Sequence, residues 1–234
     1  MTDASEPASV AWSAGFWDDD DPWIFEDEAR DYVARLRTAL PLTPGARVLD
    51  FGCGFGFVPR LLAPHVGTHA VWDASPAMRR RAVATLAGVH GVAPLDLASE
   101  PAPSARFDWI LVNSVIQYMS VDELAAWLRR WRGMLAPGGR IVASDVWPPD
   151  TGFVGELATV VAFALRHGLL VRTLAGGFRR GLRHRAFVRA QPLLRLDPGT
   201  LAAMATAAGL RMTRLAGNLT YRRARFAVVL DAAP

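Results

Sequence analysis

Short apolar runs alternate with amphipathic segments through the middle of the chain. The apolar runs cover residues 47–51, 70–73, 92–95, 107–113 and 140–145. The segments between them repeat apolar side chains at the three- and four-residue spacing of an α-helix, and they cover residues 58–63, 77–86 and 122–135. An alternation of this kind predicts a parallel sheet with helices on both faces.

The pattern differs on both sides of this region. Residues 26–40 carry apolar side chains at helical spacing and stop at Pro41, and residues 147–196 form a long, largely helical insertion. The last predicted elements are a helix and two strands, at residues 198–208, 210–215 and 225–230. We therefore expect an α/β fold with a Rossmann-like, doubly wound, seven-stranded sheet. It is mostly parallel, ends in an antiparallel hairpin and carries a helical cap.

The overall composition is that of a soluble globular protein. Of the 234 residues, 51% are hydrophobic and 21% are charged, which is ordinary for this class. The longest apolar run, residues 157–165, is far shorter than the roughly 18 residues that a membrane-spanning helix needs. The N-terminus is acidic and has no basic stretch leading into an apolar one. We therefore expect no secretory signal, no integral membrane segment and a cytoplasmic protein.

Two residue types are rare or absent, and each limits the chemistry. Cys53 is the only cysteine, which excludes an intrachain disulfide and a cysteine-based metal site. All 26 basic residues are arginine, so Schiff-base chemistry on lysine is excluded. The histidines and acids do not have the spacing of metal ligands, and we expect no metal.

The charge is distributed unevenly along the chain. Residues 1–150 carry 13 arginines against 19 acids, whereas residues 151–234 carry 13 against 3, for a net charge of +4. Residues 166–195 alone hold eight arginines and no acid. Such a block pairs with acids of the same protein, recognises an anionic acceptor or meets a phosphate-bearing surface. We favour pairing within the protein, with the acids at 18–21 and 26–31.

The strongest chemical signal is a glycine-rich loop between a predicted strand and a predicted helix. It reads Asp50-Phe51-Gly52-Cys53-Gly54-Phe55-Gly56. Glycines there allow a positive φ and a close approach of the backbone to a ligand, beside the free N–H groups of a helix N-terminus. The spacing is G-x-G-x-G rather than the G-x-G-x-x-G of dinucleotide-binding proteins, and an acid precedes it.

Residues 48–56 resemble motif I of the class I S-adenosylmethionine-dependent methyltransferases. The family's landmarks at the ends of the next three strands are present in order, as Asp73, Asp96-Leu97 and Asn113-Ser114. Residues 135–142 look like the segment that leads into the family's fifth strand. The resemblance is strongest to the small-molecule type and implies that the cofactor is S-adenosyl-L-methionine.

The resemblance also implies what these residues do. Asp73 would accept hydrogen bonds from both ribose hydroxyls, Asp96-Leu97 would contact the adenine, and Asn113-Ser114 would lie near the methionine moiety. Asp50 would orient the loop and the ligand amine, and Cys53 is expected to pack in the loop rather than react. The expected cofactor-binding residues are Asp50, Gly52, Cys53, Gly54, Gly56, Asp73, Ala74, Met78, Asp96, Leu97, Asn113 and Ser114. A structural alternative remains for two of them, namely a helix N-terminal acid at Asp73 and a turn cap at Asn113.

Catalytic residues are harder to predict, because methyl transfer relies largely on proximity and orientation. An oxygen or nitrogen acceptor can require a base, whereas a soft carbon or a tertiary amine does not. The candidates are Tyr118, which follows the fourth predicted strand, and His184 in the basic insertion, for which an exposed basic surface is the alternative. Residues 218–222 are expected at the ligand edge of the sheet. The histidines expected at the surface are His65, His69 and His90.

We expect the methyl acceptor to be a small molecule, such as a specialised metabolite with a hydroxyl, an amine or an acidic carbon. The insertion would form a lid over it, and the aromatic N-terminal segment would form the other wall. The expected division is an N-terminal helical and aromatic cap segment, a cofactor-binding Rossmann-like core, the substrate lid, and a terminal helix with a strand pair. These parts cover residues 1–44, 45–146, 147–196 and 197–234.

Three other functions remain open at this point. An RNA or protein methyltransferase, or a lipid or quinone methyltransferase, would apply residues 166–195 to an anionic surface. A non-enzymatic binding protein would keep the fold, and the intact glycine loop argues against it. Nucleic acid is an unlikely partner, because the fourth strand continues as Asn113-Ser114-Val115-Ile116 rather than as the Asn/Asp-Pro-Pro-Tyr/Phe motif of nucleic-acid amino-methyltransferases. The oligomeric state is unknown.

Overall fold

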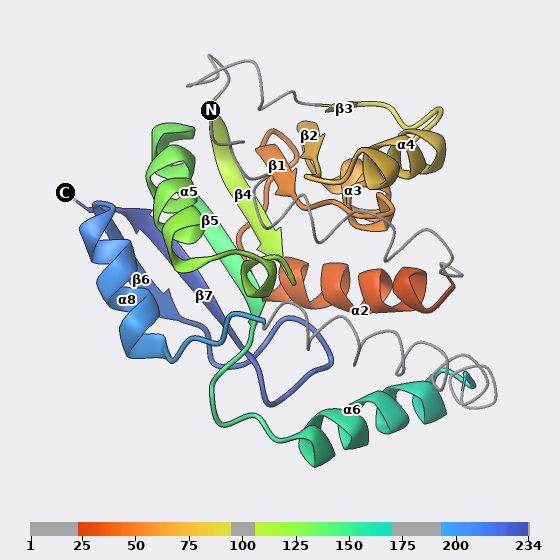
Figure 1. Cartoon of the computed structure of the whole chain (residues 1–234). Coiled ribbons are helices and arrows are strands. Elements are labelled where there is room, and N and C mark those ends of the chain that lie inside the picture. The colour runs from red at the N-terminus through yellow and green to blue at the C-terminus, as the bar shows by residue number, and fades with distance from the viewer. Residues whose placement is uncertain (1–22, 95–105, 170–192, 234) are drawn as a thin grey trace, which may run out of the picture.

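The computed structural model describes residues 23–94, 106–169 and 193–233, and its sheet has the predicted topology (Figure 1). Seven strands lie in the order β3-β2-β1-β4-β5-β7-β6. Their bounds are β1 (Arg47–Phe51), β2 (Thr68–Trp72), β3 (Val92–Pro94), β4 (Phe107–Asn113), β5 (Leu135–Val146), β6 (Leu210–Arg214) and β7 (Phe226–Ala232). Strands β1 to β5 run parallel, whereas β7 pairs antiparallel with both β5 and β6. The predicted mostly parallel sheet with a terminal antiparallel hairpin is confirmed.

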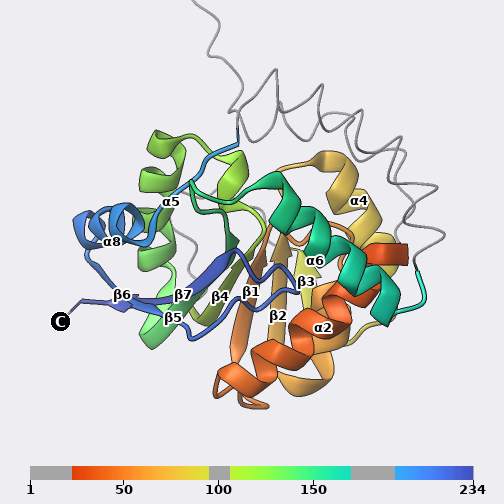
Figure 2. The same ribbon diagram turned by 90° about the horizontal axis from the view of Figure 1, so that it is seen from below.

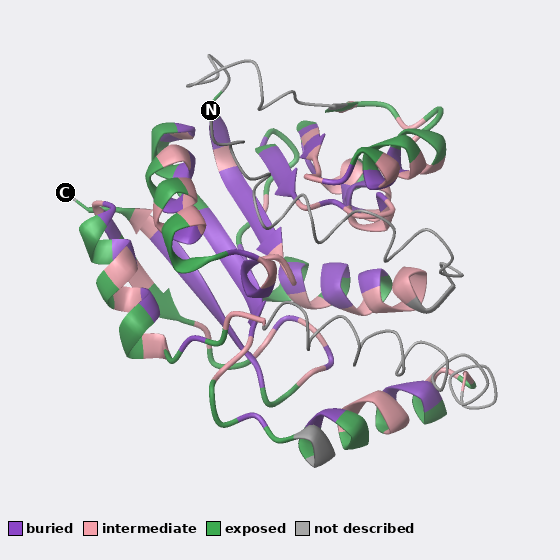
Figure 3. Cartoon of the chain, in the orientation of Figure 1, coloured by how far each residue is buried: buried purple, intermediate pink, exposed green. Residues whose placement is uncertain are grey.

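Helices cover both faces of this sheet, as the view from below shows (Figure 2). The bounds of the α-helices are α2 (Trp23–Ala39), α3 (Phe57–Leu62), α4 (Pro76–Thr85), α5 (Val121–Gly133), α6 (Phe153–Arg166) and α8 (Pro198–Ala207). Two short 3-10 helices are η1 (Ala63–His65) and η2 (Ile116–Tyr118). Buried residues of α2 and α3 pack on one face of the sheet, and buried residues of α5 and α8 pack on the other. The strands between these layers are buried along most of their length (Figure 3).

Side-chain caps explain where several helices begin. The hydroxyl of Ser75 accepts from the backbone N–H of Met78 at the start of α4, which also has a proline in its first turn. Helix α5 has a complete capping box, in which Ser120 and Glu123 each accept from the other's backbone N–H. The carboxylate of Asp197 caps α8 by accepting from the backbone N–H groups of Gly199 and Thr200. These caps fix the helix starts to within one residue of the predicted positions.

Strand β5 begins five residues earlier than predicted. The sequence Pro137-Gly138-Gly139 was expected to separate helix α5 from the strand, but the structure includes it in β5 as an irregularity between the pairings of Phe107 and Trp109 of β4. A Cβ atom on Gly139 would stand only 2.5 Å from the carbonyl oxygen of Phe107. Glycine is therefore required there by the close approach of the two backbones.

The insertion after β5 is described only in part. Helix α6 lies across the end of the molecule beyond α2, and residues 170–192, including the predicted site residue His184, lie outside the described residues. The aromatic residues of the N-terminal segment before Trp23 also lie outside them. Among the helices that the structure describes, none has the length and apolarity that a membrane span requires.

The prediction that His69 lies at the surface is wrong. Strand β2 starts at Thr68, two residues earlier than predicted, so the alternation of the strand turns His69 to the same side as the buried Val71. The side chain is 1% exposed, and both of its ring nitrogens lack a hydrogen-bond partner in the structure. Burial lowers the pKa of His69 to about 3, so the imidazole is neutral at ordinary pH.

A buried neutral histidine makes stability depend on pH. Below the ordinary pKa of about 6.5 the unfolded chain binds a proton that the folded chain refuses until about pH 3, so the free energy of unfolding falls as the pH falls through this window. We expect His69→Leu to reduce the pH dependence of the free energy of unfolding in this window by up to about 1.4 kcal/mol per pH unit. Urea denaturation at pH 7 and pH 5 measures it, with the exposed His90→Gln as control. Equal pH dependence of His69→Leu and the native protein would contradict the assignment.

Candidate active site

The glycine loop joins β1 to α3 and is fixed against β2. The backbone N–H groups of Gly52 and Cys53 both donate to the carbonyl oxygen of Trp72, at 2.7 and 3.1 Å. Gly52, Gly54 and Gly56 have φ values of +83°, +54° and +81°. This left-handed backbone favours glycine, and it explains why three glycines alternate with larger residues.

Two of these glycines are also required by packing, and one is not. A Cβ atom at Gly52 would stand 2.3 Å from the side chain of Val115, and one at Gly56 would stand 3.2 Å from the backbone of Ala82 in α4. A Cβ atom at Gly54 would meet nothing within 4 Å. Gly54 therefore presents bare backbone to open space, which is the surface that a closely bound ligand needs.

Asp73 follows β2 and links the loop to α4. One carboxylate oxygen accepts from the backbone N–H of Gly54 at 2.9 Å, and the other accepts from the N–H of Ser75 at 2.8 Å. Burial raises the pKa of Asp73, while these hydrogen bonds and the charge of Arg79 oppose the rise. Each carboxylate oxygen keeps a further lone pair, so the group can accept two more hydrogen bonds from a ligand.

Asp50 is the least satisfied acid of the site. It is 3% exposed, at the penultimate position of β1, and its Oδ2 atom has no hydrogen-bond partner in the structure. Burial and the nearby charge of Asp73 raise the pKa of Asp50 to about 7. A buried carboxylate in this state favours the binding of a cation.

The ends of β4 and β5 are joined by polar side chains. Asn113 accepts a hydrogen bond from the hydroxyl of Ser144 at 2.8 Å, and the hydroxyl of Ser114 donates to Asp145 at 2.7 Å. Ser114 and Asp145 have φ values of +56° and +62°, which are unusual for residues other than glycine. Strained backbone of this kind is concentrated at functional sites, and here it stands at the carboxyl edge of the sheet.

Asp145 is the centre of a buried ionic cluster that the sequence analysis missed. Its carboxylate accepts from Arg225 at 2.7 Å, from Thr220 at 2.7 Å and from Asn218 at 3.1 Å. Burial opposes its ionisation, but the charges of Arg225 and Arg222 and the hydrogen bonds outweigh it and hold the pKa of Asp145 below its usual range. The expectation that residues 218–222 reach this edge agrees with these contacts.

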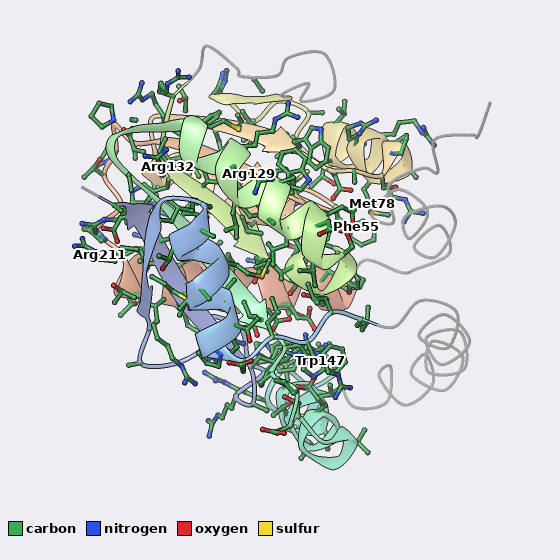
Figure 4. The ribbon with its side chains drawn as sticks, turned by 60° about the vertical axis from the view of Figure 1, so that its left-hand side comes forward. Phe55, Met78, Arg129, Arg132, Trp147 and Arg211 are labelled. Atoms are coloured by element: carbon green, nitrogen blue, oxygen red, sulfur yellow. The ribbon has the colours of Figure 1, made fainter. Side chains whose placement is uncertain are left out.

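The same cluster holds helix α6. Glu156, in the first turn of α6, accepts from Arg225 at 2.7 and 3.2 Å and from Arg222 at 2.9 Å. Farther along α6, the ring of Phe163 stacks on Tyr221 with 4.3 Å between centroids. Trp147, labelled in Figure 4, follows β5 and lies between the guanidinium groups of Arg225 and Arg195, 4.3 and 4.8 Å from its centroid.

The structure describes some of the other predicted site residues, and the rest lie outside the described residues. Burial raises the pKa of Tyr118, and the charges of Arg225, Asp145 and Arg222 also act on it, so the phenol keeps its proton and is not a base. Met78 is buried in α4, and Ala74 lies in the turn before it. Burial also raises the pKa of Cys53 well above its usual value, which leaves a protonated thiol. The remaining predicted residues, Asp96, Leu97 and His184, lie outside the described residues.

This part of the chain is similar to a known protein domain. A model described as a methyltransferase domain matches residues 49–141, from within β1 to within β5, and therefore includes the glycine loop, Asp73 and the end of β4. Residues 49–141 therefore form a methyltransferase domain. S-adenosylmethionine, the methyl donor that the resemblance of residues 48–56 implies, is the expected cofactor of this domain.

Relatives and solved structures agree with this family. The chain is 29% identical over 221 residues to a ubiquinone biosynthesis O-methyltransferase from Xylella fastidiosa, covering 89% of this chain and 78% of the relative. It is 36% identical over 128 residues to a trans-aconitate 2-methyltransferase from Methylobacterium nodulans, covering 53% and 47%. The fold matches that of the N-methyltransferase NodS from Bradyrhizobium japonicum, solved with S-adenosyl-l-homocysteine, with a TM-score of 0.62 and 17% identity over 98% of this chain and 100% of the other.

The residues of this methyltransferase fit its cofactor. S-adenosylmethionine carries a cationic ammonium and sulfonium and has two ribose hydroxyls, whereas the site offers an unpartnered buried carboxylate at Asp50, free lone pairs at Asp73 and bare backbone at Gly54. Within the described residues, histidines, cysteines and acids do not gather in groups of three that would hold a metal.

The raised pKa of Asp50 predicts that cofactor affinity depends on pH. The ammonium group of the ligand binds the ionised carboxylate better, so the affinity for S-adenosylhomocysteine should rise as the pH increases through about 7. Because Asp50→Asn cannot ionise, its affinity should be lower and nearly independent of pH. The folded-state pKa lies above the ordinary value of 3.8, so ionisation destabilises the ligand-free protein above that pH, and Asp50→Asn should stabilise it at pH 8 by on the order of 1–3 kcal/mol.

Calorimetric titration between pH 6 and pH 8.5 and urea denaturation of the ligand-free protein test both halves of this prediction. Asp122→Asn, an exposed acid in the first turn of α5, is the control. A pH-independent affinity of the native protein, or a less stable Asp50→Asn protein at pH 8, would contradict the prediction.

Proposed function

We propose that this methyltransferase methylates a small molecule bound at the carboxyl edge of β4 and β5, beneath helix α6. The observation that carries the proposal is the buried ionic cluster that fastens α6 to this edge, through Glu156, Arg225 and Asp145. We infer that a helix held there covers an acceptor bound beside the glycine loop. An acceptor enclosed in this way is small, because a polymer would need an open groove.

The roles that we propose for the residues of the cofactor site follow from the family resemblance and from the geometry. Asp73 accepts from the ribose hydroxyls, the backbone of Gly52 and Gly54 lies against the ligand, and Asp50 balances its positive charge. Asn113 and Ser114 stand beside the methionine moiety. When bound, the cofactor supplies an activated methyl group, whose transfer joins it to the acceptor while the carbon–sulfur electron pair stays on sulfur. Cys53 and Gly56 shape the loop, whereas Ala74 and Met78 follow Asp73.

Unsatisfied polar atoms near the carboxyl edge support a polar acceptor. The Oε1 atom of Gln117, the indole nitrogen of Trp147 and the hydroxyl of Thr151 are buried without a hydrogen-bond partner in the structure. Gln117 follows β4, and the other two follow β5. Buried polar atoms are usually satisfied, so these exceptions after the ends of β4 and β5 favour a ligand that completes them.

Orientation rather than a strong base supplies the catalysis in this proposal. The carboxylate of Asp145 is occupied by its own partners, and Tyr118 keeps its proton. The residues of this edge therefore hold the nucleophilic atom in line with the methyl group and exclude water. Tyr118 serves as a hydrogen-bond donor, and the role of His184 stays a prediction.

The alternative acceptors are RNA, a lipid or a quinone, and the cationic side chains that the structure describes beside α6 have acidic partners within the protein. Arg222 and Arg225 are paired with Glu156 and Asp145, and His167 at the end of α6 lies 3.8 Å from Asp31 of α2. Transfer of a radiolabelled methyl group to panels of phenols, carboxylic acids, amines, RNA and quinone-containing vesicles separates these functions. We expect labelled small molecules, and label confined to RNA or vesicles would contradict the proposal.

Weakening the attachment of α6 should weaken the binding of the acceptor and leave the binding of the cofactor nearly unchanged. In Glu156→Gln the helix loses the charge that pairs with Arg222 and Arg225, so the KM for an acceptor found in the screen should rise about five- to tenfold, since hydrogen bonds to charged groups each contribute about 1.5–3 kcal/mol. The affinity for S-adenosylhomocysteine should change less than about twofold, because Glu156 lies outside the proposed cofactor contacts.

A surface ion pair provides the matched control for this experiment. Asp231→Asn removes the partner of Arg211 at the exposed end of the β6–β7 pair, without touching α6. Its acceptor KM should equal that of the native enzyme. An unchanged acceptor KM in a folded Glu156→Gln protein would show that α6 does not cover the acceptor.

A further inference from the structure

Arg79 is an exposed residue of the first turn of α4 whose guanidinium turns back onto the end of β2. Its Nη1 atom donates to the carbonyl oxygen of Asp73 at 2.6 Å and lies 3.4 Å from that of Ala74. These two carbonyls belong to the turn that carries the Asp73 carboxylate. The arginine therefore holds the backbone of the same residue whose side chain links the glycine loop to α4.

The position of Arg79 also matters for the charge of the site. The ionisable groups that face Asp73 are Asp50 from β1, Cys53 from the glycine loop and Arg79 from α4. Asp50 repels the charge of Asp73, while Arg79 attracts it and also acts on Cys53. Positive charge next to a pair of buried acids allows one of them to stay ionised while the other waits for a ligand.

We propose that Arg79 is a positioning residue of the cofactor site, which holds the turn after β2 and supplies the positive charge that balances Asp73. The inference rests on the proposed role of Asp73 as the acceptor for the ribose hydroxyls. Only an ionised carboxylate offers all its lone pairs to two hydroxyl donors. Only a fixed turn keeps both of its oxygens in place, and Arg79 provides both conditions without touching the cofactor.

The neighbouring residue makes a matched comparison possible. Arg80 is the next residue of α4, is equally exposed and carries the same charge, and none of the hydrogen bonds to Asp73 or Ala74 comes from it in the part of the chain that the structure describes. Substitutions at the two positions change the net charge by the same amount. Any difference between them therefore reports the contact of Arg79 with the turn.

The experiment is calorimetric titration with S-adenosylhomocysteine from pH 5.5 to pH 8.5. We expect Arg79→Gln to weaken binding about three- to tenfold, because both a charge-assisted hydrogen bond and the balancing charge are lost. The loss should be largest at low pH, where Asp73 without Arg79 takes up a proton first. Arg79→Lys keeps the charge and should restore the pH profile while recovering only part of the affinity. Arg80→Gln should bind within about twofold of the native protein.

Asp73→Ala separates the failure of this inference from the failure of the proposed site. Binding lost in Asp73→Ala but equal in Arg79→Gln and Arg80→Gln overturns the role of Arg79 and leaves the proposed site standing. Unchanged binding in Asp73→Ala overturns the site itself. If Arg79 acts through Asp73, the double variant Arg79→Gln with Asp73→Ala should bind no more weakly than Asp73→Ala alone. An additional loss in the double variant would contradict the inference.

Discussion

Asp50 and Asp73 stand at the carboxyl ends of the neighbouring strands β1 and β2, and the burial of the Asp50 carboxylate beside the charge of Asp73 is the constraint on which the site depends. Backbone N–H groups of Gly54 and Ser75 satisfy Asp73, and Arg79 lies on its turn. Asp50 keeps an oxygen without a partner and a pKa near 7. The ligand-free protein thus holds an unbalanced negative charge, which a cationic ligand relieves on binding.

The backbone of the glycine loop is constrained as well, by the side chains and the helix packed against it. A Cβ atom would meet Val115 at Gly52 and α4 at Gly56, so glycine fits these two positions of the path that the loop takes between β1 and α3. That path sends the N–H of Gly54 to Asp73 and leaves its Cα facing open space. Packing of the core therefore determines where the ligand-facing backbone lies.

The acid at the end of β5 has the opposite environment. Asp145 is as deeply buried as Asp50, but Arg225, Ser114, Thr220 and Asn218 satisfy its carboxylate. A satisfied buried acid holds structure rather than binding a ligand, and this one ties α6 to the sheet through Arg225 and Glu156. The carboxyl edge of the sheet thus has two parts. At the ends of β1 and β2 an unpaired negative charge attracts the cofactor, and at the end of β5 a fully paired acid holds α6 in place.

Local patterns in the sequence were sufficient for the sheet and the glycine loop, because strand alternation, helix caps and G-x-G-x-G spacing act within a few residues. The apolar pattern places the start of β2 two residues too late and therefore predicts His69 at the surface. Extending the alternation of the strand back from Val71 turns His69 toward the interior. The early start of β5 depends on the approach of Gly139 to Phe107 of another strand, which no local pattern records. The Asp145 cluster joins residues up to 80 positions apart, and its one sequence signal was an acid ending a buried strand, as at Asp50 and Asp73.

A crystal structure of the protein with S-adenosylhomocysteine tests the central claim, that the unbalanced acids of β1 and β2 form the cofactor site and α6 covers the acceptor beside it. The account predicts both ribose hydroxyls within hydrogen-bonding distance of Asp73, the ligand's ammonium on the side of Asp50, and its sulfur facing a closed space between β4, β5 and α6. A ligand that leaves Asp73 uncontacted, or whose sulfur faces bulk solvent away from α6, would contradict it.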